Sequence, residues 1–141
     1  MAQQLSVFLE NAPGRLNRLA RTLGDHGINM HALFVADTSD YGVARIICDK
    51  TDYAVEVLRE AGFSVTMTEV VAVEVPDRPG ALADLLECIA SANIDISYSY
   101  CFVEPRTKNA VNVFRLRSID AEEVIRAAGF RVLRNVDLHS A

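Results

Sequence analysis

Two turns of similar composition lie 66 residues apart in this chain. Residues 10–16 read Glu-Asn-Ala-Pro-Gly-Arg-Leu, and residues 76–82 read Pro-Asp-Arg-Pro-Gly-Ala-Leu, so that Gly14 corresponds to Gly80. Each turn follows an alternating apolar run, which is typical of a strand, and precedes apolar residues at helical spacing. A strand–turn–helix construction that occurs twice predicts a chain built from two similar halves.

The first half contains a complete set of elements. We expect strands at residues 5–10, 28–36, 43–49 and 64–68, with a hairpin turn at residues 37–42. Apolar residues at i, i+3, i+4 and i+7 predict a helix through residues 16–23. A second helix is expected before Gly62, with Thr51 or Asp52 as its cap.

The second half repeats this order. Strands are expected at residues 71–75, 94–102, 110–116 and 131–138, and helices at residues 82–91 and after Asp120. The hairpin loop at residues 104–109 is expected to be one residue longer than its counterpart. Each half therefore reads as β-α-β-β-α-β, a ferredoxin-like α+β fold with an antiparallel sheet and both helices on one face. We expect two domains, 1–69 and 70–141, side by side, because no flexible linker separates them.

The composition excludes several classes of protein. The net charge is −5 and there is no basic run, which argues against a nucleic acid or an anionic membrane as partner. No apolar stretch is long enough to span a bilayer, and the N-terminus does not resemble a signal peptide. The three cysteines have no C-x-x-C spacing, so we expect no disulfide framework, no metal, no cofactor and a cytoplasmic location. Cys48 and Cys101 lie in apolar runs and are expected to be buried.

The repeated turn has a chemical interpretation and a purely structural one. Proline removes an N–H group, glycine permits a positive φ, and the start of a helix leaves N–H groups without partners. Such a turn suits a carboxylate or a phosphate. It can equally be a strand-to-helix connection without any ligand, and the sequence leaves both interpretations open.

The sheet faces that the helices do not cover predict association. They alternate between polar residues and apolar groups such as Phe114 and Leu116. A partly apolar open face usually has a partner, so we expect a homodimer or a larger assembly.

Both halves resemble tandem ACT domains. In each, an amide or acidic residue precedes Pro-Gly-x-Leu at the first helix, and Ile-Asn or Ile-Asp opens the second strand. The matching stretches are 11–16 with 27–30, and 77–82 with 93–96, and the resemblance covers essentially the whole chain. It implies regulatory modules that commonly bind amino acids and that associate through their sheets.

The resemblance also implies where a ligand lies. In the family, the first loop of one domain commonly meets the start of the second strand of its neighbour. One expected site combines Asn11, Ala12, Pro13, Gly14, Arg15 and Leu16 with Ile94, Asp95 and Ile96. The other combines Asp77, Arg78, Pro79, Gly80, Ala81 and Leu82 with Asn29, Met30 and His31.

An amino acid suits these loops chemically. Backbone N–H groups at Gly14 or Leu16 can hold its carboxylate, and Asn11 or Asp77 can accept from its ammonium group. We therefore expect a non-catalytic module that binds an amino acid and controls a separate enzyme or regulator. The alternatives are a structural interaction module with vestigial sites and, less favoured, a small acylphosphatase-like hydrolase. Proline stands where the phosphate cradle of such a hydrolase needs an N–H donor.

Overall fold

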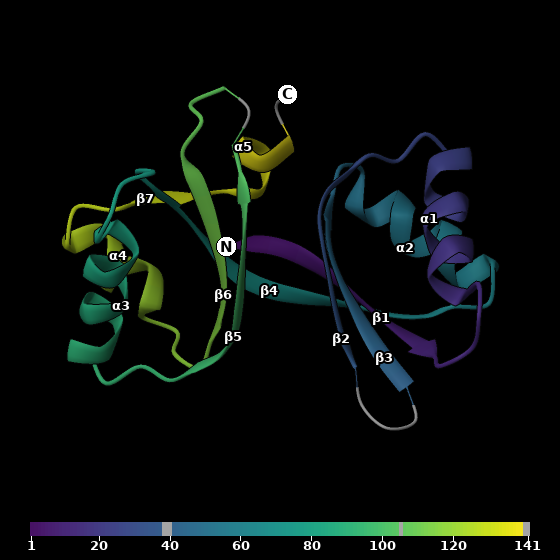
Figure 1. The fold of residues 1–141 in the computed structure, drawn as a ribbon, viewed down its shortest axis with the longest axis horizontal. Helices are drawn as coiled ribbons and strands as arrows, with labels where there is room; N and C mark the ends of the chain where they lie inside the picture. Colours follow the sequence, from purple (N-terminus) through teal and green to yellow (C-terminus); the bar gives the residue numbers. More distant parts are fainter. Residues whose placement is uncertain (38–40, 105, 140–141) are drawn as a thin grey trace. The chain divides into compact units, whose positions relative to one another are not determined.

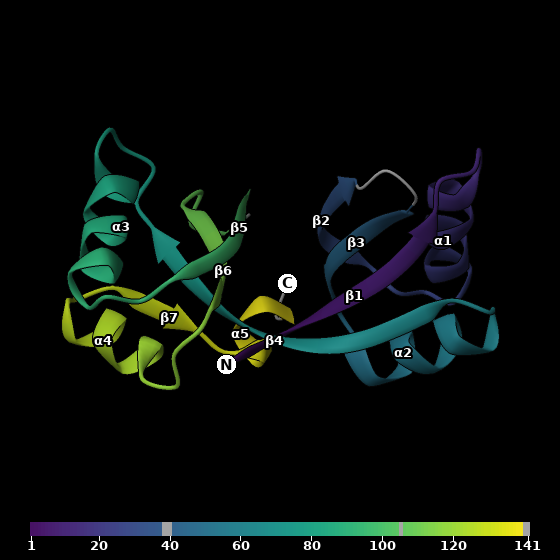
Figure 2. The same cartoon turned by 90° about the horizontal axis from the view of Figure 1, so that it is seen from below.

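The computed structural model of this chain describes residues 1–37, 41–104 and 106–139 and contains two compact units. One unit comprises residues 3–68, and the other comprises residues 1–2 with 69–141. Figures 1 and 2 show that the two longest helices of each unit pack on one face of its sheet. The fold class predicted from the sequence, two ferredoxin-like units with antiparallel sheets, is confirmed.

The unit of residues 3–68 follows the expected order. Its elements are β1 (Ala2–Glu10), α1 (Arg15–Asp25), β2 (Met30–Asp37), β3 (Tyr41–Cys48), α2 (Thr51–Glu60) and the first part of β4 (Ser64–Val75). The strands lie in the order β2-β3-β1-β4. Antiparallel pairing places Leu9 opposite Gly42 and Leu5 opposite Ile46.

The other unit uses the second part of β4 as its first strand. It continues with α3 (Ala81–Ser91), β5 (Ile96–Val103), β6 (Ala110–Leu116), α4 (Ala121–Ala127), β7 (Arg131–Leu133) and α5 (Asn135–His139). β4 pairs with β6 on one side and with β7 on the other, and β5 forms the edge beyond β6. This strand order matches that of the first unit.

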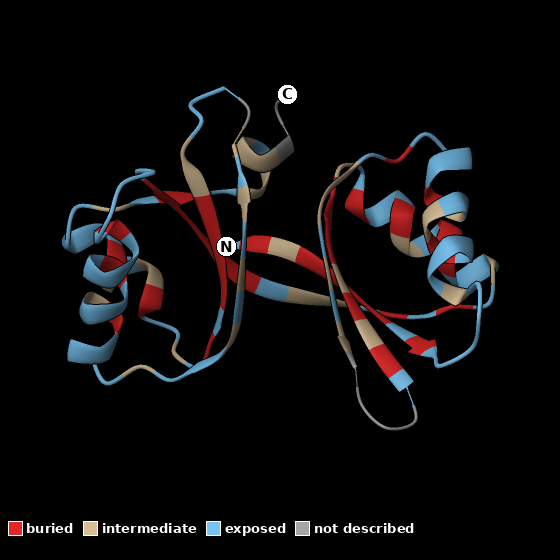
Figure 3. Ribbon diagram, viewed as in Figure 1, coloured by how far each residue is buried: buried red, intermediate tan, exposed pale blue. Residues whose placement is uncertain are grey.

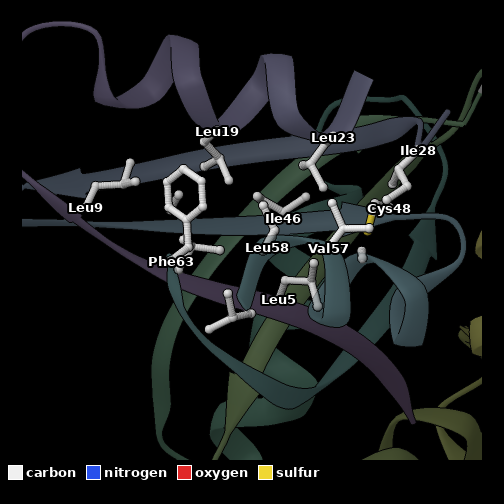
Figure 4. Packing of buried hydrophobic residues seen from close by; sticks show 14 residues of the cluster. Leu5, Leu9, Leu19, Leu23, Ile28, Ile46, Cys48, Val57, Leu58 and Phe63 are labelled. Carbon is white, nitrogen blue, oxygen red and sulfur yellow. The ribbon is translucent and has the colours of Figure 1, made fainter. Parts of the chain in front are cut away.

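Each unit has its own apolar core between its helices and its sheet (Figure 3). In the first unit, Leu5 and Leu9 of β1 pack with Leu19 and Leu23 of α1 and with Leu58 of α2 (Figure 4). In the second unit, alternate residues of β4 pack with α3 and α4. Members of that core include Val71, Val73, Leu85, Ile89, Phe114 and Ile125.

The prediction for Phe114 and Leu116 was wrong, because both belong to this core rather than to the open face. The register explains the error. Phe114 lies opposite Val71, and opposed residues of an antiparallel pair point to the same face. Val113 therefore shares the other face with Ala72.

Three local expectations need correction. The last strand ends at Leu133, and α5 follows it, because the Asp137 carboxylate accepts from the backbone N–H of Arg134 at 2.8 Å and closes a helical turn. The cap of α2 is Lys50 in the left-handed region, at φ 49°, rather than Thr51 or Asp52. Cys48 is buried as expected, whereas Cys101 is exposed on the edge strand β5.

The predicted hairpins are only partly visible. Residues 38–40 of the first predicted turn and residue 105 of the second lie outside the described residues. The registers still fix their relative lengths, because Val35 pairs with Ala44 and its counterpart Cys101 pairs with Asn112. The second hairpin is therefore two residues longer than the first, rather than one. In the described residues, no helix has both the length and the apolar character needed to span a membrane.

Candidate functional site

The first repeated loop connects β1 to α1 through a tight set of backbone hydrogen bonds. Ala12 N–H donates to the Glu10 carbonyl at 2.8 Å, Arg15 N–H to Ala12 at 3.3 Å, and Arg18 N–H to Gly14 at 2.9 Å. Gly14 caps the helix with φ 84° and ψ −2°. The positive φ expected of this glycine is confirmed.

The second loop has the same bonds 66 residues later. Arg78 N–H donates to Pro76 at 2.9 Å, Ala81 N–H to Arg78 at 3.3 Å, and Asp84 N–H to Gly80 at 3.0 Å. Gly80 caps α3 with φ 86° and ψ −12°. The repeat in the sequence is therefore a repeat in backbone geometry, and it does not depend on the side chains that differ between the loops.

Each loop leaves backbone donors open. No acceptor in the described part of the chain takes the N–H groups of Gly14, Leu16 and Asn17, and no side-chain oxygen caps α1. At the second loop the same holds for Gly80, Leu82 and Ala83 within the described residues. Donors at a helix start carry partial positive charge and favour an anionic group.

A hollow of about 460 Å³ lies at the first loop. Residues from the loop, the first turn of α1, and strands β1, β2 and β3 line it. They are Leu9, Glu10, Asn11, Ala12, Pro13, Arg15, Leu16, Val35 and Gly42. Five of the six residues expected at the first loop therefore line one hollow, and the sixth, Gly14, is the cap of α1 beside it.

An ion pair lies at the edge of this hollow. A guanidinium nitrogen of Arg15 donates to a carboxylate oxygen of Glu10 at 2.9 Å, with both side chains substantially exposed. Such a pair adds less than about 1 kcal/mol to stability. It does mean that the only cation lining the hollow among the described residues already has an anionic partner.

A second hollow of about 210 Å³ adjoins the first. It shares Leu9, Glu10 and Arg15 with the first hollow and adds Arg18 and three aromatic rings. The Arg18 guanidinium lies 4.7 Å from the centre of the Phe63 ring and also donates to the Ala61 carbonyl at the end of α2. Arg18 thus joins α1 to the end of α2, as a cation near a helix C-terminus can.

Charged groups lie close to the second loop as well. Glu74, two residues before that loop, is almost fully buried and accepts from Thr107 at 2.7 Å, Arg131 at 2.6 Å and Asn109 at 3.4 Å. These bonds, the one from Thr107 first, hold the pKa of Glu74 below its ordinary value. The corresponding position in the first unit is Phe8, so the surroundings of the two loops differ in charge. In the second loop, the Arg78 guanidinium lies 3.6 Å from the Asp84 carboxylate, and both side chains are exposed.

The remaining expected residues lie at the other end of each sheet. In the first unit, Met30 pairs with Cys48, whereas Glu10 pairs with Tyr41. In the second, Ile96 pairs with Leu116, whereas Val75 pairs with Ala110. The structure therefore does not bring a loop together with the second strand of its own unit. The pairing of each loop with the second strand of a neighbouring domain stays a prediction.

The residues at those strand starts are held by their own units. Asn29 N–H donates to an Asp49 carboxylate oxygen at 2.9 Å, and Met30 packs against the first core. His31 is half-buried. Ile94 packs against the second core, and Asp95 and Ile96 are exposed.

Sequence reasoning missed four residues that line the first hollow, namely Leu9, Glu10, Val35 and Gly42. Leu9 was expected only as part of a strand, Glu10 only as the junction of that strand with the turn, and Gly42 only as part of a hairpin turn. The β-α-β-β-α-β order contains a usable signal, because it pairs the third strand with the first and so places Gly42 beside the end of β1. No group of three or more His, Cys, Asp or Glu side chains suited to a metal was found among the described residues.

The loops, the strand order and the duplicated core define a pair of ACT domains. The family model for the ACT domain pair matches residues 1–140, and this chain belongs to that family.

Solved structures agree with this assignment. The chain is 35% identical to protein BT0572 from Bacteroides thetaiotaomicron, with a TM-score of 0.92 and coverage of 99% of this chain and 96% of that one. The ligand-free regulatory subunit of aspartate kinase from Thermus thermophilus shares the fold, with a TM-score of 0.66, 17% identity and 89% coverage of each chain. The regulatory subunit of aspartate kinase from Thermus flavus is similar, with a TM-score of 0.63, 18% identity and 89% coverage of each chain. No curated protein matches the chain.

Proposed function

We propose that this chain is a non-catalytic regulatory module that binds an amino acid and controls a separate metabolic enzyme or regulator. The observation that carries the proposal is the first loop, where open N–H donors stand beside a hollow of about 460 Å³. Membership of the ACT family supports the regulatory role.

The loop suits the head group of an amino acid. The N–H groups of Gly14 and Leu16 are open to a carboxylate in the described chain. Asn11 and Glu10 line the same hollow with oxygens that can accept from an ammonium group. The carboxylate of the ligand would thus meet N–H donors, and its ammonium group would meet oxygen acceptors.

The chemistry at the first loop does not favour hydrolysis of an acyl phosphate. Pro13 lacks an N–H group, and the guanidinium of Arg15 is occupied by Glu10. An arginine that cradles phosphate would first have to leave that carboxylate.

The test is thermal unfolding of the purified chain against each of the twenty amino acids, with acetyl phosphate in parallel. A ligand at about 100 times its Kd adds roughly 2.7 kcal/mol, a shift of several degrees. A selective shift supports the proposal. No shift with any amino acid at millimolar concentration favours an interaction module with vestigial sites, and turnover of acetyl phosphate favours a hydrolase.

Two variants locate the binding. Gly14→Asp and Gly80→Asp each place a negative charge among the open N–H donors of one loop. We expect each to abolish binding at its own loop, measured by calorimetry on variants whose circular dichroism matches the wild type. Unchanged affinity in both variants would exclude these loops as the site.

We also propose that the chain forms a homodimer. Apolar side chains exposed on the edge strands, Leu33 on β2 and Val103 on β5, support this, because isolated chains seldom expose several at their sheet edges. Light scattering at micromolar concentration tests it, and a monomer mass would refute it.

A further inference from the structure

We propose that the hollow at the first loop selects an amino acid with a branched aliphatic side chain, of the size of valine, isoleucine or leucine. This inference rests on the proposed function, and it adds the chemical class of the effector and the residues that choose it. It draws on the wall of the hollow, whereas the proposed function draws on the backbone donors of the loop.

The wall of the hollow is aliphatic. Leu9 is buried at the end of β1, whereas Leu16 on α1 and Val35 on β2 are each 41% exposed. Ala12 and Pro13 complete the apolar lining. An aliphatic group held in the hollow would cover Leu16 and Val35, which the chain alone leaves open to water, and removal of apolar surface from water drives binding.

Gly42 provides space within this wall. A Cβ there would lie 3.4 Å from the Ala36 carbonyl oxygen, 3.7 Å from a Val35 methyl group and 4.0 Å from the Asn11 side-chain oxygen. The φ of Gly42 does not require glycine, so the role of this glycine here is to leave space and not to relieve backbone strain. Because Gly42 has no side chain, the Asn11 amide and the Val35 methyl group border the same position. An amino acid needs this arrangement, with a polar acceptor for its ammonium group next to an apolar surface for its side chain.

The second loop lacks this wall. By strand register, Ala110 takes the place of Gly42, because it pairs with Val75 as Gly42 pairs with Leu9. Cys101 takes the place of Val35. Leu82 remains at the position of Leu16, so this leucine alone does not distinguish the two loops.

The same lining disfavours other side chains. An acidic side chain would have to displace Glu10 from Arg15, since these two form a pair at 2.9 Å. An aromatic side chain finds no ring to stack on among the described residues that line this hollow. A glycine or alanine ligand would leave Leu16 and Val35 largely uncovered.

The experiment is isothermal titration calorimetry of the full chain with leucine, isoleucine, valine, alanine, aspartate, lysine and phenylalanine. Each buried methylene should tighten binding about fourfold, so leucine should bind on the order of 50-fold more tightly than alanine. Tighter binding of aspartate, lysine or phenylalanine than of any aliphatic amino acid would overturn the inference while leaving the proposed function intact. Binding of none of these seven, together with no thermal shift by any of the twenty amino acids, would overturn both.

Variants then assign the selectivity to this wall. Val35→Thr keeps the shape but replaces a methyl group with a hydroxyl group, and Leu16→Ala removes most of one side of the hollow. Each should weaken leucine binding about tenfold and leave alanine binding within about twofold. Both sites are exposed, so the variants should fold, and circular dichroism checks this. Leu86→Ala, at an exposed leucine of α3 outside both loops, should leave leucine affinity unchanged. A loss of leucine affinity in Leu82→Ala with none in Leu16→Ala would overturn the inference by placing the side chain at the second loop.

Discussion

Two glycines of the first helix separate the effect of backbone conformation from that of packing. Gly14 caps α1 at φ 84°, whereas Gly24 lies inside α1 without a positive φ. A Cβ at either position would find no heavy atom within 4 Å. Replacing each by alanine therefore changes no contact, and any difference in stability comes from the backbone.

The two substitutions should change the free energy of unfolding in opposite directions. Alanine at Gly14 must adopt the left-handed region, which costs about 1–2 kcal/mol, and recovers about 0.4–1 kcal/mol because its unfolded chain has less freedom. We expect a net loss of about 1 kcal/mol. Alanine at Gly24 should add up to about 1 kcal/mol, the difference in helix propensity. The two variants should differ by about 2 kcal/mol.

Urea unfolding followed by circular dichroism measures this difference. If the slope of the unfolding free energy against urea concentration is unchanged, the variants expose the same surface area on unfolding as the wild type. In thermal unfolding the same difference corresponds to roughly 6 °C. Gly80→Ala, at φ 86°, should behave like Gly14→Ala. If Gly14→Ala were as stable as Gly24→Ala, the left-handed cap, and with it the geometry of the repeated loop, would be refuted.

Three further predictions follow from single contacts. Burial raises the pKa of the Cys48 thiol to about 12, so Ellman's reagent at pH 8 should modify the exposed Cys101 first, the half-buried Cys88 more slowly, and Cys48 only on unfolding. Reaction of all three thiols in the folded chain would contradict this. The pKa of Glu74 is lower in the folded chain than in the unfolded chain, so its carboxylate stabilises the fold at a pH above the unfolded pKa. This stabilisation is lost as the pH falls through the folded pKa. The urea midpoint of Glu74→Gln should therefore decline less steeply below about pH 4.5 than that of the wild type. An equally steep decline in that variant would refute it. Arg18→Ala should lower the unfolding free energy by about 1 kcal/mol, because it removes the contact with the Phe63 ring, and an unchanged urea midpoint would show that this contact contributes nothing.

The fold was predictable because local sequence patterns in each half indicate its helices, strands and turns. Alternation marks the strands, helical spacing marks α1 and α3, and the two glycines mark the caps. Repetition strengthens every such assignment, since a pattern that occurs twice at a fixed offset must suit the same local structure. This is why the element order and the positive φ of Gly14 could be read before the structure was known.

The errors come from features that local patterns do not contain. The alternating pattern around Phe114 predicts a strand, but the sheet face on which Phe114 lies depends on its pairing with Val71. Cys101 lies in an apolar run, but it is exposed because β5 is an edge strand. The hollow likewise depends on pairing, because Val35 and Gly42 are distant in sequence from the loop they border. Register and strand order are properties of the whole sheet, and a short window of sequence cannot supply them.

The comparison of the two loops separates what duplication preserves from what it leaves free to change. The three backbone hydrogen bonds and the left-handed glycine are the same in both, because the connection from strand to helix needs them for folding. The residues around that frame are under no such requirement, so Asn11 corresponds to Asp77 and Gly42 to Ala110. The backbone donors that suit a carboxylate are thus present twice as a consequence of the fold, and they identify no particular ligand. Selectivity must come from the residues that differ, which is why the wall formed by Leu16 and Val35 is a sharper guide to the effector than the turn that first marks the site.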